Sequence, residues 1–204
     1  MRILDLFSTP NSLIETIDLT NGTLLWSANF LSAEEADHVF AHLQNEVPWQ
    51  QESINLFGRQ VAQPRLQAWY GDAEYTYSGL TMQPLPWFPL LLELKQRCEA
   101  ASGTRFNSVL ANLYRDGQDS MGWHQDNEPE LGRNPVIASL NLGDSRRFVL
   151  KHKHNGERRQ LDLHHGSLLI MSGETQHFWR HCVPKTAQPK SARINLTFRQ
   201  INSL

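Results

Sequence analysis

The chain has 204 residues, of which 40% are hydrophobic and 20% are charged, and its formal net charge is −2. These proportions are typical of a soluble globular domain with a sizeable core, and they exclude a disordered tail and a coiled coil. Charge is unevenly distributed, since residues 1–144 carry 8 basic and 18 acidic residues whereas residues 145–204 carry 11 and 3. A basic segment is one feature of proteins that bind polyanions, although the two halves would compensate each other if they intermix in the fold.

A hairpin and an amphipathic helix are predicted at the start of the chain. Residues 11–31 form the hairpin, because Asn21-Gly22 is a strong turn signal with apolar residues on both sides. A capping box over 32–35 then begins a helix over 33–47, in which apolar residues recur at helical spacing. No apolar run reaches the roughly 20 residues of a membrane span, so no membrane contact is expected.

The next segment is irregular and leads to a second helix. Residues 50–80 lack helical periodicity and contain several glycines, which predicts short strands and loops. The second helix is expected to start near Pro86 and Pro89 and to stop at Gly103.

Cysteine content indicates the compartment. The chain has only Cys98, on the apolar stripe of the second helix, and Cys182. We expect Cys98 to be a buried thiol. Two cysteines are too few for a disulfide framework or a four-thiolate zinc site, and the start of the chain has no signal-peptide pattern. These features favour a reducing compartment, so we expect a cytoplasmic protein.

Short strands dominate the chain from residue 105 onward. They are predicted at 107–114, 135–142, 146–153, 159–164, 166–172 and 192–201, where β-branched or alternating segments are separated by turn residues. Several short strands after two helices predict an α+β, β-rich fold with a jelly-roll or barrel core and helices packed outside it.

A His-x-Asp tripeptide is the first candidate for chemistry. If residues 124–126 are extended, His124 and Asp126 point to the same face. A second histidine would complete the triad of two histidines and one carboxylate that is typical of non-haem iron(II) oxygenases. The tripeptide alone is a weak signal, because so short a motif often occurs by chance.

Candidates for the second histidine lie further along the chain. His181 begins a segment that can pack antiparallel beside the first ligand strand. His177 would share a face with His181 only in a helix, and the buried strand before it argues against a helix there. His152 and His154 lie between lysines beside an Asn-Gly turn, so we expect them at the exposed tip of a hairpin, where phosphate contact is the functional alternative.

The last strand carries an unusual polar face. Residues 193, 195, 197 and 199 alternate with Ile194, Leu196 and Phe198 and therefore share one side. Arg193 and Arg199 on an inward face are costly unless they meet anions. A dicarboxylate cosubstrate could supply one anion through a bidentate pair, and acidic side chains of the protein are the alternative.

Four motifs follow one another along the chain: Asn-x-Tyr at 112–114, His-x-Asp at 124–126, a distant histidine, and Arg-x-Asn-x-Thr-x-Arg at 193–199. This order of motifs resembles the AlkB family of iron(II)- and 2-oxoglutarate-dependent dioxygenases. The resemblance covers roughly residues 50–204 and is closest to members that repair alkylated nucleic acid. Segments similar to the substrate side of that subgroup are Phe57-Gly58-Arg59, Pro64-Arg65, Tyr70-Gly71-Asp72 and Tyr77-Ser78-Gly79-Leu80.

The resemblance implies a role for each matching residue. The iron ligands would be His124, Asp126 and His181, since the hydrophobic–proline step after His181 fits the family better than the residues after His177. The residues implied for 2-oxoglutarate are Asn112, Tyr114, Arg193, Asn195 and Arg199. The residues implied for substrate are Phe57, Gly58, Arg59, Tyr70, Gly71, Asp72 and Asn127. Asn127 stands where many relatives carry an acidic residue, which leaves base preference open.

The resemblance also implies an activity. The chain would oxidatively demethylate N-alkylated bases in DNA or RNA with Fe(II), O2 and 2-oxoglutarate, releasing succinate, CO2 and an aldehyde. The alternative is the same chemistry on a protein or a small molecule. Separately from the resemblance, Leu56-Phe57-Gly58-Arg59 offers an apolar pair, a glycine and a cation, which predicts that Phe57 fills the gap left by a flipped base. The alternative is that Phe57 is an ordinary core residue. Residues 1–104 would form an extension with two helices and a substrate-recognition hairpin, and residues 105–204 a double-stranded β-helix, in one compact unit that we expect to be a monomer.

Overall fold

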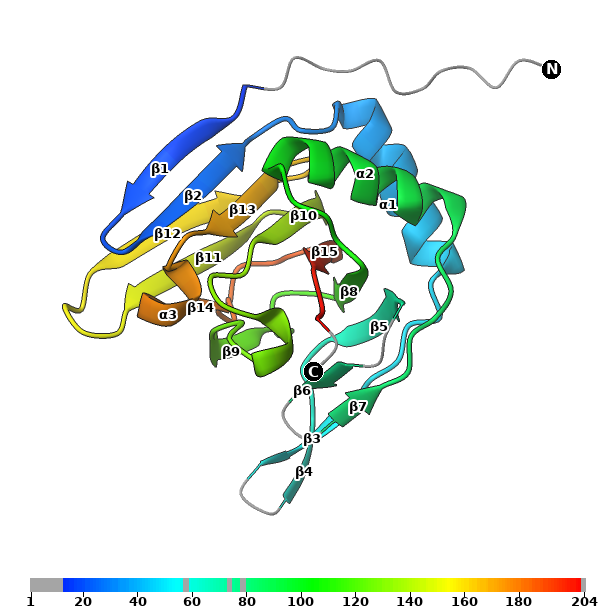
Figure 1. Cartoon of the computed structure of the whole chain (residues 1–204). Coiled ribbons are helices and arrows are strands. Elements are labelled where there is room, and N and C mark those ends of the chain that lie inside the picture. Colours follow the sequence, from blue (N-terminus) through cyan, green and yellow to red (C-terminus); the bar gives the residue numbers. More distant parts are fainter. Residues whose placement is uncertain (1–12, 57–58, 73–74, 78–79, 203–204) are drawn as a thin grey trace.

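Two β-sheets face each other and form the centre of the protein, and two long helices cover one outer side (Figure 1). This computed structural model describes residues 13–56, 59–72, 75–77 and 80–202. The larger sheet has the strand order β1-β2-β13-β10-β15-β8-β5, and the smaller sheet has the order β12-β11-β14-β9. The arrangement confirms the predicted jelly-roll core with flanking N-terminal helices.

The larger sheet combines strands from both halves of the chain. Its strands are β1 (Glu15–Leu19), β2 (Gly22–Ser27), β5 (Leu66–Gly71), β8 (Ser108–Tyr114), β10 (Ile137–Gly143), β13 (Leu168–Ser172) and β15 (Arg193–Arg199). The predicted hairpin is β1–β2, but its two-residue turn is Thr20-Asn21 rather than Asn21-Gly22, because Gly22 already pairs with Leu19 as the first residue of β2. Asn21 takes the left-handed conformation of the turn (φ 55°). β2 continues the sheet by pairing antiparallel with β13, so residues before 105 complete the sheet formed by those after it.

The smaller sheet and two separate hairpins complete the strands. The sheet contains β9 (Met121–His124), β11 (Arg146–His152), β12 (Arg158–Leu163) and β14 (Trp179–Val183). β3 (Ser53–Leu56) pairs with β4 (Arg59–Ala62), and β6 (Tyr75–Tyr77) pairs with β7 (Leu80–Met82). These hairpins confirm that the segment 50–80 consists of short strands and loops.

Both predicted helices are present and pack on the outer face of the larger sheet. α1 (Ala33–Glu46) begins with the complete capping box, in which the Ser32 hydroxyl accepts from the Glu35 amide and the Glu35 carboxylate accepts from the Ser32 amide. α2 (Pro89–Ser102) buries the Cys98 thiol completely, as predicted. No helix in the described part of the chain is long and apolar enough to span a membrane.

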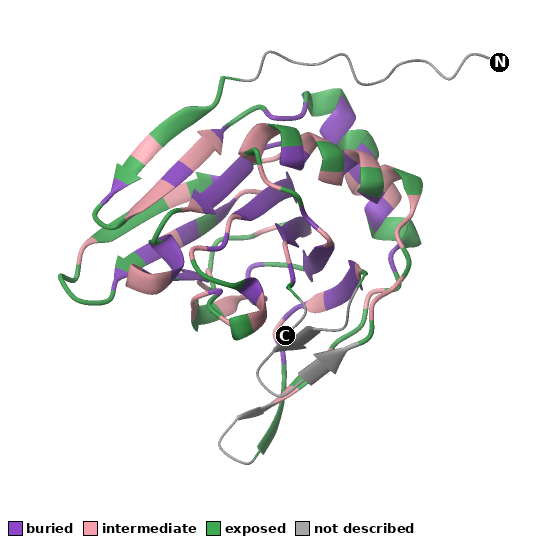
Figure 2. Ribbon diagram, in the orientation of Figure 1, coloured by how far each residue is buried: buried purple, intermediate pink, exposed green. Residues whose placement is uncertain are grey.

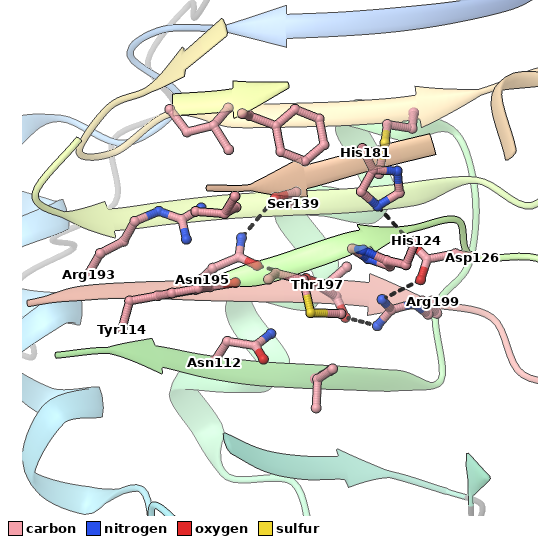
Figure 3. Close-up of a pocket in the computed structure, with 16 residues that line it drawn as sticks. Asn112, Tyr114, His124, Asp126, Ser139, His181, Arg193, Asn195, Thr197 and Arg199 are labelled. Atoms are coloured by element: carbon pink, nitrogen blue, oxygen red, sulfur yellow. Dashed lines mark hydrogen bonds and ion pairs between the residues drawn. The ribbon is translucent and has the colours of Figure 1, made fainter. Parts of the chain in front are cut away.

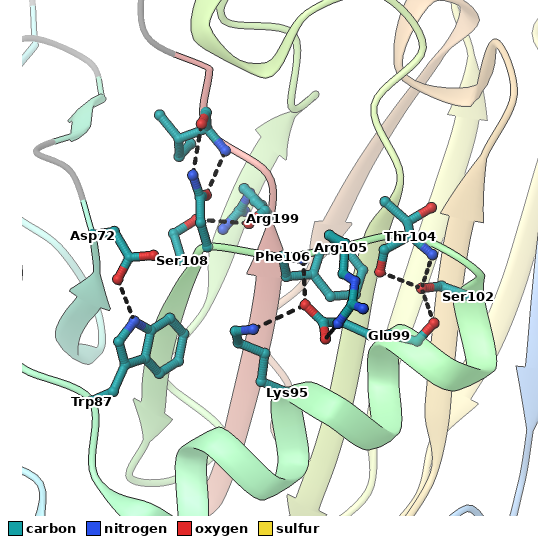
Figure 4. Close-up of polar contacts among 12 residues, drawn as sticks. Asp72, Trp87, Lys95, Glu99, Ser102, Thr104, Arg105, Phe106, Ser108 and Arg199 are labelled. Atoms are coloured by element: carbon teal, nitrogen blue, oxygen red, sulfur yellow. Dashed lines mark hydrogen bonds and ion pairs between the residues drawn. The ribbon is translucent and has the colours of Figure 1, made fainter.

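A buried carboxylate fixes the end of α2 to the start of β8. Glu99 accepts the Phe106 backbone amide at 2.8 Å and pairs with Lys95 at 2.9 Å and Arg105 at 3.2 Å (Figure 4). Gly103 ends the helix with a φ of 67°, a conformation that favours glycine. This junction sets where β8 begins, and β8 forms part of the cavity described below.

The side chains of β15 divide between two cores. Ile194, Leu196 and Phe198 are fully buried against the helices. The alternate residues of β15 face the smaller sheet, where a second cluster of buried side chains includes Phe148 and Trp179. Figure 2 shows that the central strands of the larger sheet are mostly buried. The predicted alternation therefore places a row of polar residues in the interior, where each needs a polar partner.

The absence of a helix around His177 was a wrong prediction. Residues Thr175–Phe178 form one helical turn, α3, between β13 and β14. The reason is that Gly173, directly after β13, turns the chain with a φ of 61°, and the buried Thr175 hydroxyl then donates to the Ser172 carbonyl. A buried strand therefore does not prevent a single helical turn directly after it.

The prediction that His152 is exposed at a hairpin tip was also wrong, whereas His154 is exposed. Only 4% of His152 is accessible, because it continues the inward row of Phe148 and Leu150 along β11. Its ring stacks on Phe178 at 5.8 Å, and its Nδ1 accepts the backbone amide of His154 at 3.2 Å. The aromatic ring explains how a histidine between two lysines becomes a core residue.

Candidate functional site

Two neighbouring strands of the smaller sheet bring two histidines and a carboxylate together. β14 pairs antiparallel with β9, and His181 lies directly opposite His124. β9 ends at His124, so Asp126 lies in the following loop rather than in an extended strand. The ligand atoms of all three residues nevertheless lie within 4.8 Å of one another. The predicted triad is thus one cluster, with a pattern that suits a divalent first-row metal such as iron.

Local contacts orient the two imidazoles. His124 Nδ1 lies 2.9 Å from the Gly122 carbonyl, which assigns its proton to Nδ1 and leaves the Nε2 lone pair for a metal. The His124 and His181 rings meet edge to face at 4.2 Å. Burial, and the repulsion that a second proton would meet beside His124, lower the pKa of His181 to about 3, so this imidazole is neutral at physiological pH. Neutral imidazoles are the form that binds metal.

Asp126 is held from two sides. Its Oδ1 accepts from Arg199 Nη2 at 2.9 Å, and its backbone amide donates to the buried Gln176 Oε1 at 2.9 Å. Burial acts to raise the pKa of Asp126, but Arg199 and the two histidines outweigh it and lower the pKa to about 2. Asp126 is therefore a charged carboxylate at neutral pH, 3.8 Å from His181 Nε2.

Alanine substitution should separate the two candidate histidines. His177 lies on α3 and does not line the cavity that contains the triad, whereas His181 faces Asp126. We expect His181→Ala to abolish turnover of 2-oxoglutarate to succinate and His177→Ala to keep substantial turnover. Melting temperatures of both variants control for folding. The reverse ranking of the two variants would transfer the ligand role to His177.

Acid should destabilise the metal-free protein between pH 7 and pH 5. The pKa of His181 is about 3 in the folded protein and ordinarily 6.5, so between these values the unfolded chain binds a proton that the folded protein does not. Stability therefore falls as pH falls, by about 2 kcal/mol over this interval for this one group. Denaturant unfolding of chelator-treated protein measures the change. The same pH dependence in His181→Gln would show that another group is responsible.

A small interior cavity of about 50 Å³ extends from the triad along β15 and β8. Figure 3 shows Arg193 at one end of this cavity and His124, Asp126 and His181 at the other. The pairing of β15 with β8 explains the arrangement, because Arg193 lies opposite Tyr114 and Asn195 lies opposite Asn112. The Asn-x-Tyr and Arg-x-Asn motifs are therefore cross-strand neighbours.

Arg193 is a buried cation without an acidic partner among the described residues. Only 1% of it is accessible, its Nη2 donates to Asn141 Oδ1 at 2.6 Å, and its guanidinium carbon lies 4.9 Å from the Tyr114 ring centroid. Its Nε and Nη1 have no hydrogen-bond partner among the described residues. A buried cation with unsatisfied donors is costly, and a carboxylate in the cavity would satisfy both the charge and the donors. Arg199 differs, because it pairs with Asp126.

Buried amides line the cavity between its two ends. Asn112 Oδ1 accepts from Arg65 Nε at 2.7 Å, which commits the amide oxygen and leaves the Nδ2 donors available. Asn195 Nδ2 donates to Ser139 Oγ at 2.8 Å, and its Oδ1 accepts from Thr197 at 2.9 Å. The side chains predicted to hold 2-oxoglutarate, Asn112, Tyr114, Arg193, Asn195 and Arg199, all line this cavity.

The residues predicted to contact substrate are not gathered in this cavity. Phe57 and Gly58 lie outside the described residues. Arg59 is exposed on β4, and Asn127 is exposed directly after Asp126. Their role in substrate binding stays a prediction.

The three remaining substrate-side residues lie at the end of β5 and directly after it, and they make structural contacts. Tyr70 is buried edge to face against Phe88 at 5.6 Å. A side chain on Gly71 would collide with the Asn107 carbonyl. Asp72 is exposed and accepts from Trp87 Nε1 at 2.9 Å (Figure 4). These contacts place Tyr70, Gly71 and Asp72 outside the cavity lining, and a substrate role for them also stays a prediction.

Several supporting residues were missed by the sequence analysis. Gln176 holds the Asp126 backbone, and Asn141 holds Arg193. A signal for Asn141 was present, since Ser139 and Asn141 alternate with Ala138, Leu140 and Leu142 in a strand that is otherwise apolar. Arg65 was noted only as part of a substrate-side segment, and its contact with Asn112 gave no signal, because only the fold brings the two residues together.

Comparisons with known proteins agree with this geometry. Residues 23–199 match the family model described as the 2OG-Fe(II) oxygenase superfamily. The chain is 47% identical over 182 residues to "Alpha-ketoglutarate-dependent dioxygenase alkB homolog 3" of Homo sapiens, covering 84% of this chain and 64% of that protein. It is 41% identical over 180 residues to "DNA oxidative demethylase ALKBH2" of Homo sapiens, covering 82% of this chain and 69% of that protein.

A solved structure shares the fold. The structure of OsALKBH1 aligns with a TM-score of 0.67 and 18% sequence identity, covering 91% of this chain and all of that chain. In the sequence comparison, the present chain spans a little under two thirds of the length of the alkB homolog 3 proteins that it matches.

Proposed function

Because the chain belongs to the AlkB family within the 2OG-Fe(II) oxygenase superfamily, we propose that it oxidatively removes alkyl groups from the nitrogen atoms of nucleobases in DNA or RNA. The observation that carries the proposal is a buried cavity with a His-Asp-His cluster at one end and, at the other, an arginine that no acidic residue of the described chain neutralises. Iron(II) with 2-oxoglutarate and dioxygen would supply the oxidation of the alkyl carbon, with release of succinate, CO2 and an aldehyde.

The donor set fits iron(II). His124, Asp126 and His181 provide two neutral imidazoles and one charged carboxylate, and three protein ligands leave coordination positions for other molecules. Arg199 and Gln176 position Asp126 through its carboxylate and its backbone amide. Contacts of this supporting kind typically change metal affinity or activity about 10- to 100-fold.

The cavity also fits a dicarboxylate. Arg193 would bind the carboxylate far from the metal, because its fork of nitrogen donors matches a carboxylate and has two donors that the described residues leave unused. Arg65 would orient Asn112 so that amide donors, rather than the amide oxygen, face an anionic cosubstrate. Apolar walls that include Leu110, Met121 and Phe148 would limit access of water to the cavity.

The assignment to nucleic acid is supported by the relatives and by charge. A relative that shares 41% identity is named a DNA oxidative demethylase. The basic character of residues 145–204 suits a polyanionic substrate. We further infer that the protein works as a monomer in the cytoplasm, and the two free, buried thiols of Cys98 and Cys182 are consistent with a reducing compartment.

Succinate release tests the proposal. Turnover with Fe(II) and 2-oxoglutarate should rise when oligonucleotides containing 1-methyladenine or 3-methylcytosine are added, and it should not rise with the matched unmodified oligonucleotides. A panel with etheno adducts, each single- and double-stranded, would establish lesion preference. Uncoupled turnover that no alkylated oligonucleotide stimulates would favour a protein or a small molecule as the substrate instead.

A further inference from the structure

The outer face of the smaller sheet carries a row of cations. Lys151 on β11 lies directly opposite Arg158 on β12 and directly opposite Arg180 on β14. All three residues are exposed. They point away from the cavity, because the neighbouring His181 and Leu150 are the buried, inward residues of the same strands. Three adjacent strands therefore present three like charges in one line.

This row lacks acidic partners. No ion pair within the described part of the chain involves the three cations of the row or the nearby Lys153. The neighbouring Glu157 is paired with Arg159 at 2.8 Å. Like charges directly opposite each other destabilise a sheet. The arrangement therefore costs folding stability, and an external polyanion would offset that cost.

An aromatic ring and a groove lie beside the row. Trp123 is 47% exposed, although large aromatic side chains are usually buried. Trp123, Arg180, Lys151 and Lys153 line one open groove of about 450 Å³, together with His152 and His154. The buried His152 accepts two backbone amides at Nδ1, and its Nε2 has no partner among the described residues. These contacts hold the β11–β12 turn in place, and with it the two lysines.

We propose that this face, which we call the Trp123 groove, binds the single-stranded flank of the nucleic acid whose alkylated base enters the cavity. Backbone phosphates would lie along Arg158, Lys151 and Arg180, and an unpaired base would stack on Trp123. Cations combined with an exposed aromatic ring are the chemistry that recognises single strands without regard to sequence. The proposal rests on the proposed function and adds a second contact outside the cavity.

Position along the chain connects the groove with the site. Trp123 directly precedes His124, so the two side chains lie on opposite faces of β9. A strand that crosses the edge of the smaller sheet could reach both faces. A very short oligonucleotide could occupy only the cavity, because the row from β12 to β14 alone spans about 10 Å.

The test uses the full chain, a long fluorescein-labelled oligo(dT) and fluorescence anisotropy over a range of salt concentrations. The triple variant Lys151→Gln/Arg158→Gln/Arg180→Gln should reduce the magnitude of the slope of log affinity against log salt by about 2. Each of the three lost phosphate contacts contributes roughly 0.7 to that slope. Trp123→Ala should weaken binding roughly 5- to 150-fold, and Trp123→Phe should recover most of the loss. Arg105→Gln, at a side chain that is 89% exposed at the α2–β8 junction, controls for the loss of one surface arginine outside this face.

Stability separates a binding role from a structural one. The triple variant should keep or raise the melting temperature, because it removes cross-strand repulsion. In demethylation assays it should lose more activity on a long alkylated strand than on an alkylated trinucleotide. Any of four results would overturn the proposal: equal losses of activity on both substrates, an unchanged salt slope, an equal effect of Arg105→Gln, or a preference of the protein for anionic lipid vesicles over oligo(dT).

Failure of the proposed function would look different. In that case the wild-type protein would demethylate neither the trinucleotide nor the long strand, whatever it binds. The proposal for the Trp123 groove alone would be overturned by a different pair of results. The wild-type protein would demethylate the trinucleotide, and wild type and the triple variant would bind oligo(dT) identically.

Discussion

Asp126→Asn is expected to abolish succinate formation while the protein remains folded. Asparagine keeps the size of the side chain and an oxygen that accepts from Arg199 Nη2, now 2.9 Å from Asp126 Oδ1. It removes the negative charge that an open iron site requires from its carboxylate ligand. Because loss of a supporting residue already costs about 10- to 100-fold, loss of a ligand should bring turnover below detection. Succinate formation and calorimetric titration with Mn(II), a redox-quiet substitute, measure the two effects.

Asp126→Ala should lose turnover as well, but for two reasons. It removes the ligand, and it leaves the buried Arg199 without its carboxylate. Removing one partner of a buried ion pair typically costs about 3–5 kcal/mol. The melting temperature should therefore fall for Asp126→Ala much more than for Asp126→Asn. Substantial turnover in Asp126→Asn would contradict the assignment of this carboxylate to the metal.

Arg193→Leu should raise the KM for 2-oxoglutarate with a smaller effect on kcat at saturation. Arg193 is the cavity cation that has no acidic partner among the described residues, and a charge-assisted bond of this kind is worth about 1.5–3 kcal/mol, or roughly 10- to 150-fold in affinity. Arg193→Lys should recover only part of the loss, because an ammonium group cannot form the two-pronged contact. Steady-state kinetics with 2-oxoglutarate as the varied substrate give both constants.

Folding of the Arg193 variants needs a control, since Arg193 is buried over Tyr114 and donates to Asn141. Melting temperature and far-ultraviolet circular dichroism should show a folded protein in each case. Removing a buried cation that lacks a counter-charge should not lower stability much, because the leucine removes an unsatisfied charge. A folded Arg193→Leu variant with the wild-type KM for 2-oxoglutarate would assign the far carboxylate to another residue.

The fold was predictable because the main signals were local. The hairpin turn, which lies at Thr20-Asn21 one residue before the predicted position, and the capping box at Ser32 are short motifs whose geometry depends on a few neighbouring residues. The alternation in 193–199 was equally direct, since apolar and polar residues at every second position indicate a strand with one apolar and one polar face. These local signals agree with the observed elements to within a few residues.

The cavity was predictable where strand pairing brings motifs together. Arg193 opposite Tyr114 and His181 opposite His124 follow from antiparallel pairing of strands that each carry a recognisable motif. The role of Arg199 could not be decided from the strand alone, because both a cosubstrate and an acidic side chain would satisfy it. The structure gives it Asp126 as a partner.

Long-range contacts account for the features that were not predictable from the sequence. Arg65 reaches Asn112 across 47 positions of sequence, and the His152 ring packs against Phe178 and Trp179, which lie about 26 positions away. The helical turn at α3 depends on a glycine and on the hydroxyl of a single threonine. The partners in these contacts cannot be read from periodicity, since each contact arises when separate elements meet, although the alternation of β11 already places His152 on its inward side.

The central claim is that the cavity performs oxidative demethylation of a nucleobase. Its most direct test is mass spectrometry of a single-stranded oligonucleotide with one 1-methyladenine, incubated with the protein, Fe(II) and 2-oxoglutarate in air. We predict a mass loss of one CH2 that requires both additions, is accompanied by formaldehyde, and is absent with Asp126→Asn. An oligonucleotide of unchanged mass, in a reaction where the same protein converts 2-oxoglutarate to succinate, would contradict the claim.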